Sequence, residues 1–275
     1  PVSLSPHAFF LPDGAGAQRF CLFHPAQGQR LRGCVVYVHP FAEEMNKARR
    51  MAALQSRALA AAGFSVLQID LLGCGDSAGD FGDASWQAWV DDVLRACAWL
   101  RQRDAEHAQA PLWLWGLRAG CLIAVEAAAQ LDGPCNFCFW QPPASGKLLL
   151  QQFLRLKLAA DMLSGNRKRL MDAMRQQLAQ GEALEIAGYR LAPELARGLE
   201  AATLKPAAPG TGRLEWLELS SRADAALSPV STQALAQWAT AGHATHSHLV
   251  TGPAFWQTSE IEDAPELIAA TLAAL

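Results

Sequence analysis

Residues 112–121 read LWLWGLRAGC, an apolar run that ends in a Gly-x-Arg-x-Gly turn. The alanine-rich stretch 121–131 that follows is predicted to be a helix. A strand, a sharp turn flanked by glycines and a helix hold the middle residue of the turn at an exposed tip, where some enzymes carry a nucleophilic serine. Here the tip is Arg118, whose guanidinium stays protonated and has no lone pair with which to attack a carbonyl.

The composition is that of a well-buried globular protein in a reducing compartment. Of the 275 residues, 51% are apolar and only 18% are charged, and the net charge of −3 gives no electrostatic case for binding nucleic acid. The seven cysteines have no framework spacing, which favours free thiols. Residues 1–12 lack the pattern of a signal peptide, and no apolar run is long enough to span a membrane. We therefore expect a cytoplasmic protein.

Strands and helices alternate on both sides of the turn, which is typical of a mainly parallel, doubly wound sheet. Strands are predicted at 7–12, 18–24, 33–40, 64–72, 112–115, 136–141, 213–219 and 245–251. Helices are predicted at 47–62, 86–103, 121–131, 229–241 and 265–275. The first two strands form an antiparallel hairpin around a Pro-Asp-Gly turn.

A charged, mostly helical segment without strands is predicted from residue 147 to about 197. Two opening antiparallel strands, the turn after the third buried strand and a helical insertion after the fourth fit the α/β-hydrolase fold, a mainly parallel sheet with helices on both faces and a helical cap. The core is predicted to comprise residues 1–141 and 213–275, and the cap residues 142–212. A Rossmann-type domain is the rival, but no G-x-G-x-x-G follows the first strand.

The segment HPFAEE, residues 39–44, follows the first buried strand. In the α/β-hydrolase fold this loop and the residue after the nucleophile supply the backbone N–H groups that bind an oxyanion. The amides of Phe41 and Ala119 are therefore predicted to contact substrate, and His39 to orient the loop rather than act as a general base. The alternative is a simple turn between a strand and a helix.

In a Ser-His-Asp triad of this fold, the acid and the histidine lie in the loops that follow the later strands. Asp224 matches the position of the triad acid, although a surface or helix-capping aspartate is the alternative. The stretch TGPAFW, residues 251–256, contains no histidine where the base belongs. His243, His246 and His248 precede it, before or within the last strand, and are not expected to reach the site.

Other candidate nucleophiles and ligands have structural interpretations. The motif DLLGCGDS, residues 70–77, is a marker of the fold, so Ser77 and Cys74 are not expected to be displaced nucleophiles. Cys121 is expected to pack against the sheet. Cys135 and Cys138 lie in an apparent strand that points them to opposite faces, so no metal site and no cofactor is expected.

Arg118 has two alternative roles. Its planar, five-donor fork can replace the missing histidine and pair with Asp224 or Glu44. Alternatively it points into the pocket, at the start of a helix, and binds a carboxylate, phosphate or sulfate. Glu44 is predicted to be the partner of Arg118 or a base, and a carboxylate at the rim of the pocket is the alternative. The candidate catalytic set is therefore Arg118, Asp224 and Glu44.

The sequence resembles the exosortase A system-associated hydrolase 2 family of α/β-hydrolases. The resemblance rests on VHPFAEEMNK at 38–47, the WGLR-x-G turn, WQPP at 140–143 with GK at 146–147, and PAFWQ at 253–257. It implies a bacterial protein encoded near exopolysaccharide and exosortase genes, beside a companion hydrolase, and it implies hydrolase activity.

Two functions follow as hypotheses. One is a hydrolase or acyltransferase for an ester or thioester, in which Arg118 and backbone amides hold an anion while Asp224 or Glu44 activates water. The other is a catalytically silent protein that binds an anionic small molecule in its pocket, or a protein partner through the cap. Because no pair of nucleophile and base can be assembled, the residues themselves favour the second hypothesis.

Overall fold

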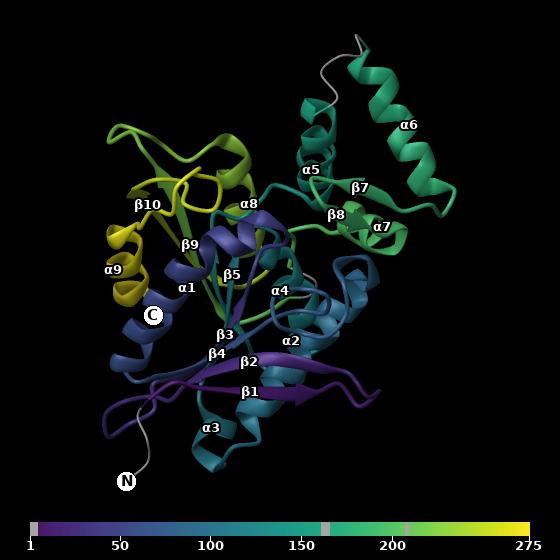
Figure 1. Ribbon diagram of the computed structural model, residues 1–275. Helices are drawn as coiled ribbons and strands as arrows, with labels where there is room; N and C mark the ends of the chain where they lie inside the picture. Colours follow the sequence, from purple (N-terminus) through teal and green to yellow (C-terminus); the bar gives the residue numbers. More distant parts are fainter. Residues whose placement is uncertain (1–4, 161–165, 207–208) are drawn as a thin grey trace.

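An eight-stranded sheet forms the centre of the computed structural model, which describes residues 5–160, 166–206 and 209–275 (Figure 1). Residues 1–4, part of the stretch examined for a signal peptide, lie outside the described residues. In spatial order the strands are β1 (His7–Pro12), β2 (Gln18–His24), β4 (Phe64–Ile69), β3 (Gly33–Val38), β5 (Leu112–Leu117), β6 (Asn136–Trp140), β9 (Arg213–Ser220) and β10 (Ala244–Thr251). The β1–β2 and β2–β4 pairs are antiparallel and all others are parallel, which confirms the predicted mainly parallel sheet.

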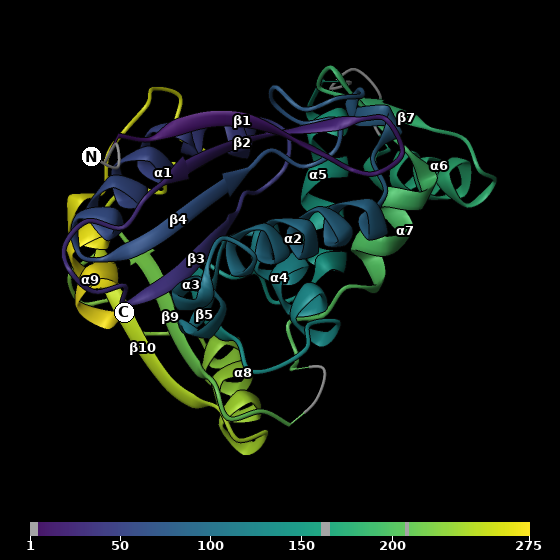
Figure 2. The ribbon, with the colours of Figure 1, turned by 90° about the horizontal axis from the view of Figure 1, so that it is seen from below.

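Helices cover both faces of the sheet, as Figure 2 shows. Helices α1 (Glu43–Ala61) and α9 (Pro265–Ala274) pack on one face, and α2 (Trp86–Arg101), α4 (Ala119–Ala129) and α8 (Pro229–Thr240) on the other. Strands β3, β4 and β5 are buried throughout because both of their faces are covered, which explains their continuous apolar sequences. The short helices η1 (Phe81–Asp83) and α3 (Ala105–Gln109) were not predicted, because so few residues show no helical period.

The segment between β6 and β9 contains α5 (Gly146–Ala160), α6 (Arg167–Ala179), β7 (Leu184–Ile186), β8 (Tyr189–Leu191) and α7 (Pro193–Ala201). The prediction that it lacks strands is wrong, since β7 and β8 pair as an antiparallel hairpin. Ala187 and Gly188 make its two-residue turn, both with positive φ. Strands of three residues are too short for an alternating pattern to be recognised. Figure 1 shows these elements grouped beside one end of the sheet, with α6 outermost.

The carboxyl ends of the parallel strands place three loops together. Val38, at the end of β3, pairs with Gly116 near the end of β5, so the loop before α1 lies beside the turn before α4. The loop after β10 follows the same edge of the sheet, where ligands bind in open parallel sheets. No helix in the described part of the chain has the length and apolar character needed to cross a membrane.

Candidate functional site

Arg118 is the only residue between β5 and α4, and its backbone has φ 54° and ψ −121°. The two glycines of the turn are required by close backbone contacts. A Cβ on Gly116 would lie 2.7 Å from the Cys121 nitrogen, and a Cβ on Gly120 would overlap the Val38 carbonyl oxygen. The fold therefore holds Arg118 at the sharp tip that the sequence predicts.

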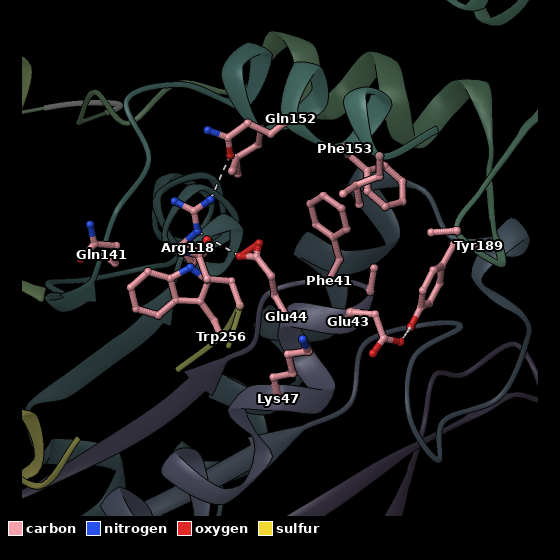
Figure 3. Close-up of a pocket in the computed structure, with 15 residues that line it drawn as sticks. Phe41, Glu43, Glu44, Lys47, Arg118, Gln141, Gln152, Phe153, Tyr189 and Trp256 are labelled. Carbon is pink, nitrogen blue, oxygen red and sulfur yellow. Dashed lines mark hydrogen bonds and ion pairs between the residues drawn. The ribbon is translucent and has the colours of Figure 1, made fainter. Parts of the chain in front are cut away.

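Arg118 lines a pocket of about 560 Å³ between the carboxyl edge of the sheet and the α5–α7 segment (Figure 3). Part of its lining is apolar and consists of Phe41, Leu149, Phe153 and Leu156. The lining also carries charged and amide groups, namely Glu43, Glu44, Lys47, Arg118, Gln141 and Gln152. The pocket therefore suits a molecule with an apolar body and a polar, charged end.

The guanidinium of Arg118 is held by two side chains. Its Nε donates to Glu44 Oε1 at 2.9 Å, and its Nη2 donates to Gln152 Oε1 at 3.0 Å. The Arg118 side chain is 15% exposed and that of Glu44 30%, so the pair is partly open to the pocket. The two predicted partners of Arg118 were Asp224 and Glu44, and in the structure Arg118 pairs with Glu44.

Glu44 reaches Arg118 because α1 begins at Glu43, four residues earlier than predicted. Ala42 precedes the helix with φ 56° and turns the chain so that both glutamates lie in the first helical turn, where the helix dipole favours negative charge. Burial raises the pKa of the Glu44 carboxyl, while the charge of Arg118 and its hydrogen bond oppose this shift. Glu44 is thus more readily protonated than an ordinary glutamate.

Two glutamines beside Arg118 have their amide nitrogens available. Gln152 Oε1 accepts from Arg118, and Gln141 Oε1 accepts from the Leu219 N–H at 2.9 Å. Neither Nε2 atom donates a hydrogen bond within the described residues, so the NH₂ group of each side chain can donate to a ligand. Figure 3 shows Gln141 on the side of Arg118 opposite to Glu44. Together these residues offer an anion several hydrogen-bond donors.

The loop before α1 contains Phe41 and His39, two residues that the sequence assigns to the site. Phe41 lines the pocket, and within the described residues neither the Phe41 nor the Ala119 N–H donates to a backbone carbonyl. His39 lies behind the loop, fully buried. Its Nε2 accepts from the Leu71 N–H at 3.0 Å, so its Nδ1 carries the proton and donates to the Pro40 carbonyl. Burial lowers the pKa of His39 to about 4, so it is neutral and positions the loop without touching the pocket.

Asp224 does not pair with Arg118. Its side chain is 79% exposed and contacts Arg222 at 3.3 Å, and it does not line the pocket. The loop after β9 carries it to the surface rather than toward the tip of β5, so the predicted Arg118–Asp224 pair is wrong. The carboxylate beside residue 118 comes instead from α1, at Glu44.

The loop after β10, which carries the base in a Ser-His-Asp triad, places Trp256 beside Arg118. The indole ring centre lies 5.8 Å from the Arg118 guanidinium carbon. The histidines that precede this loop lie elsewhere. His246 and His248 contact the buried Glu215 of β9 at 3.0 and 2.9 Å, and His243 packs on Trp238. No imidazole lines the pocket among the described residues.

The remaining cysteine and serine candidates are structural. Ser77 Oγ donates to the Asp70 carbonyl and accepts from the Phe20 N–H, and burial raises the pKa of the Cys74 thiol to about 12. Cys121 is completely buried against the sheet. All seven cysteines lie in the described part and are free thiols, and that part holds no group of three His, Cys, Asp or Glu side chains suited to a metal ion.

Several pocket residues were not predicted from the sequence. Gln152 and Phe153 come from α5, and Tyr189 from β8, where its hydroxyl donates to Glu43 of α1. No local pattern distinguishes these side chains from others in a helical segment. One backbone signal marks the site clearly, since the four non-glycine residues with positive φ in the described chain all line this pocket: Ala42, Arg118, Gln141 and Ala187.

Comparison with known proteins supports the fold. The model of the family described as serine aminopeptidase, S33, matches residues 29–178. No curated protein sequence matches the chain at a significant level.

Solved structures share the fold over nearly the whole length. They include Est1E from Butyrivibrio proteoclasticus with ferulic acid bound, at 16% identity and a TM-score of 0.68 over 97% of this chain and 98% of that one. A carboxyl esterase from Bacillus coagulans in complex with glycerol has 13% identity and a TM-score of 0.64 over 99% and 98%. XC6422 from Xanthomonas campestris, a serine hydrolase without a lid, has 15% identity and a TM-score of 0.55 over 100% and 92%. The chain thus has the α/β-hydrolase fold that the sequence predicts.

Proposed function

Because the chain belongs to the serine aminopeptidase S33 family, whose model matches more than half of it, we propose that its function resides in the pocket at the tip of β5 and is to bind an amphipathic anion. The observation that carries the proposal is the guanidinium of Arg118, fixed at the position where a nucleophile is expected and open to the pocket. A permanent cation there attracts a carboxylate, phosphate or sulfate and cannot attack a carbonyl.

Three groups support an anionic ligand. Arg118 lies at the N-terminus of α4, where the helix dipole adds positive potential. The NH₂ groups of Gln141 and Gln152 border it, and the Phe41 and Ala119 amides lie in the two adjoining turns. The apolar side chains of the lining support an acyl or aryl body on the same molecule. Est1E, of the same fold, was solved with ferulic acid, an aromatic carboxylic acid.

A second candidate function is hydrolysis or acyl transfer without a serine nucleophile. It is favoured by the raised pKa of Glu44, which suits a general base beside a bound carbonyl. In this reaction Glu44 takes a proton from water, the resulting hydroxide attacks an ester or thioester carbonyl, and Arg118 with the backbone amides stabilises the oxyanion. The leaving group departs with a proton returned by Glu44.

We place the ligand in exopolysaccharide metabolism and the protein in the cytoplasm. The first inference rests on the resemblance to the exosortase A system-associated hydrolase 2 family, and the second on seven free thiols. Residues 142–212 act as a cap over the pocket in this proposal, because α5 and β8 supply Gln152, Phe153 and Tyr189 to its wall. The outer surface of the cap is where a protein partner would bind.

The decisive experiment measures the rise in melting temperature caused by hexanoate and by hexanol. Hexanoate should stabilise the wild-type protein and hexanol should not, because only the first carries an anion for Arg118. Arg118→Gln should abolish the effect of hexanoate, whereas Arg222→Gln, which removes an exposed arginine outside the pocket, should keep it. Equal shifts for Arg118→Gln and wild type would contradict the proposal. Hydrolysis of 4-nitrophenyl hexanoate that is lost in Glu44→Gln would establish the second candidate instead.

A further inference from the structure

The pocket does not end at Arg118. A second compartment of about 260 Å³ lies on its other side, against β9 and α8. Four residues line both spaces: Arg118, Gln141, Leu149 and Gln152. Arg118 therefore stands at the junction of two compartments rather than at the end of one.

The second compartment has its own charged group, Glu218, near the end of β9. Glu218 Oε1 accepts from Trp216 Nε1 at 3.2 Å and from the Ser231 hydroxyl of α8, which fixes the orientation of the carboxylate. Among the described residues that line this compartment, Glu218 is the only acidic one and Arg118 the only basic one. The compartment thus presents an anion and a cation from different elements.

Exposed apolar side chains border both compartments. Six large hydrophobic residues are exposed in the described chain, and three of them line one compartment or the other: Leu148, Leu156 and Val230. Leu148 and Val230 belong to the second compartment and Leu156 to the first. Exposed apolar surface that gathers at a pocket marks a surface that a ligand covers.

We infer that the ligand is a phosphodiester with two unlike arms, whose phosphate binds Arg118 at the junction, whose apolar arm fills the first compartment, and whose second arm ends in an amine or hydroxyl that donates to Glu218. This inference rests on the proposed function, because it needs Arg118 as the anion site. It adds the chemical class of the anion and a second recognition group.

The position of the anion selects a phosphodiester over other anions. A carboxylate or a phosphate monoester ends the molecule that carries it, so an unbranched acid of either kind reaches only one compartment. A phosphodiester is anionic in its middle and continues on both sides. The cation of Arg118 and the anion of Glu218 also match the charges of a phosphate followed by an ammonium group.

The test compares three probes by isothermal titration calorimetry: hexyl 2-aminoethyl phosphate, hexyl methyl phosphate and hexyl phosphate. The aminoethyl diester should bind about tenfold more tightly than the methyl diester, as expected for one charge-assisted hydrogen bond. Glu218→Gln should remove this difference by weakening only the aminoethyl diester. The amide keeps the oxygen that Trp216 and Ser231 contact, so the variant retains the local structure.

Two further variants complete the design. Glu262→Gln removes an exposed carboxylate outside both compartments and should leave every affinity unchanged. Ala234→Leu, in α8, fills the second compartment and should weaken both diesters while sparing hexyl phosphate. Equal binding of the two diesters by the wild type, or a difference between them that survives Glu218→Gln, would overturn the inference.

The same titrations separate this inference from the proposed function. If hexyl phosphate binding depends on Arg118 but the affinities of the two diesters do not change in Glu218→Gln, the anion site at Arg118 is supported. The proposed contact between the second arm and Glu218 is then wrong. If Arg118→Gln leaves all three affinities unchanged, the anion site itself is wrong.

Discussion

Glu44 Oε1 accepts a hydrogen bond from Arg118 Nε at 2.9 Å, so the proposed anion site at the tip of β5 already contains an anion. The two residues are 74 positions apart in the sequence. A ligand that binds the guanidinium competes with this internal carboxylate. Glu44 is therefore expected to set both the affinity of the pocket and its dependence on pH.

Acidification should strengthen anion binding. The pKa of Glu44 is raised by burial, so its carboxyl becomes neutral at a pH above the ordinary value of 4.5 and then releases Arg118. We expect the affinity for hexyl sulfate, whose charge is constant in this range, to rise about tenfold as the pH falls toward 4.5. Glu44→Gln should bind tightly at every pH. A pH profile that is the same in both proteins would contradict this role.

The pairing itself can be measured by double-mutant cycles on the free energy of unfolding. Arg118→Ala and Glu44→Ala should be non-additive, with a coupling of about 1 kcal/mol for a partly exposed ion pair. The cycle with Asp224→Ala should be additive within about 0.5 kcal/mol, because Asp224 contacts Arg222. Coupling to Asp224 in solution would show that the loop after β9 adopts another position.

A fluorophosphonate probe should not label this protein. Such probes need a serine activated by a base, and neither a serine nor a histidine is among the described residues that line the pocket at Arg118 and Trp256. Arg118→Ser should remain unlabelled as well, because no imidazole lines the described pocket. Mass spectrometry of the treated proteins gives the readout. A modified Ser77 or Ser221 would show that the nucleophile lies elsewhere.

Much of the fold was predictable because its signals are local. The continuous apolar run of β5 and the alternation of strands with helices identify a buried parallel sheet, and the glycines around Arg118 identify the turn. The hairpin of β7 and β8 was missed because its strands have three residues each, too few for an alternating pattern to be recognised.

The candidate site was only partly predictable. Arg118, Phe41 and Glu44 follow strand ends, where the topology assigns them a common location. The choice of Glu44 over Asp224 depends on where α1 starts and on the path of a surface loop, neither of which leaves a periodic signal. Gln152 and Tyr189 come from the segment between β6 and β9, whose packing on the core is a tertiary property.

Gly120→Ala should strongly destabilise the protein. The new Cβ would overlap the carbonyl of Val38, which belongs to the backbone of β3 and has no room to move. We expect a loss of about 3 kcal/mol in the free energy of unfolding, measured by urea denaturation. Gly82→Ala is the control, since its Cβ would meet only the flexible side chain of Arg190. Similar losses in both variants would show that packing at the turn before α4 is not special.

The buried histidines should make the protein sensitive to acid. Burial lowers the pKa of His39 and of His24 from 6.5 to about 4, so each group stabilises the folded state when neutral. That stability is complete above pH 6.5 and is lost as the pH falls toward 4, on the order of 3 kcal/mol for one buried histidine. His39→Gln should flatten the curve of unfolding free energy against pH in this window, whereas replacement of the exposed His7 should not. The same pH dependence of unfolding free energy in His39→Gln and in the wild type would contradict the assignment of His39 as a neutral, buried histidine.

The backbone at residue 118 is shaped by its neighbours and not by its own side chain. Gly116, Gly120 and the strands on either side determine the turn, so a residue other than proline placed there inherits the same direction into the pocket. Substitution of residue 118 alone can therefore change the chemistry of the pocket while the fold stays the same. For the protein engineer, position 118 is a fixed attachment point at which a thiol, an imidazole or a non-natural side chain can be presented to both compartments.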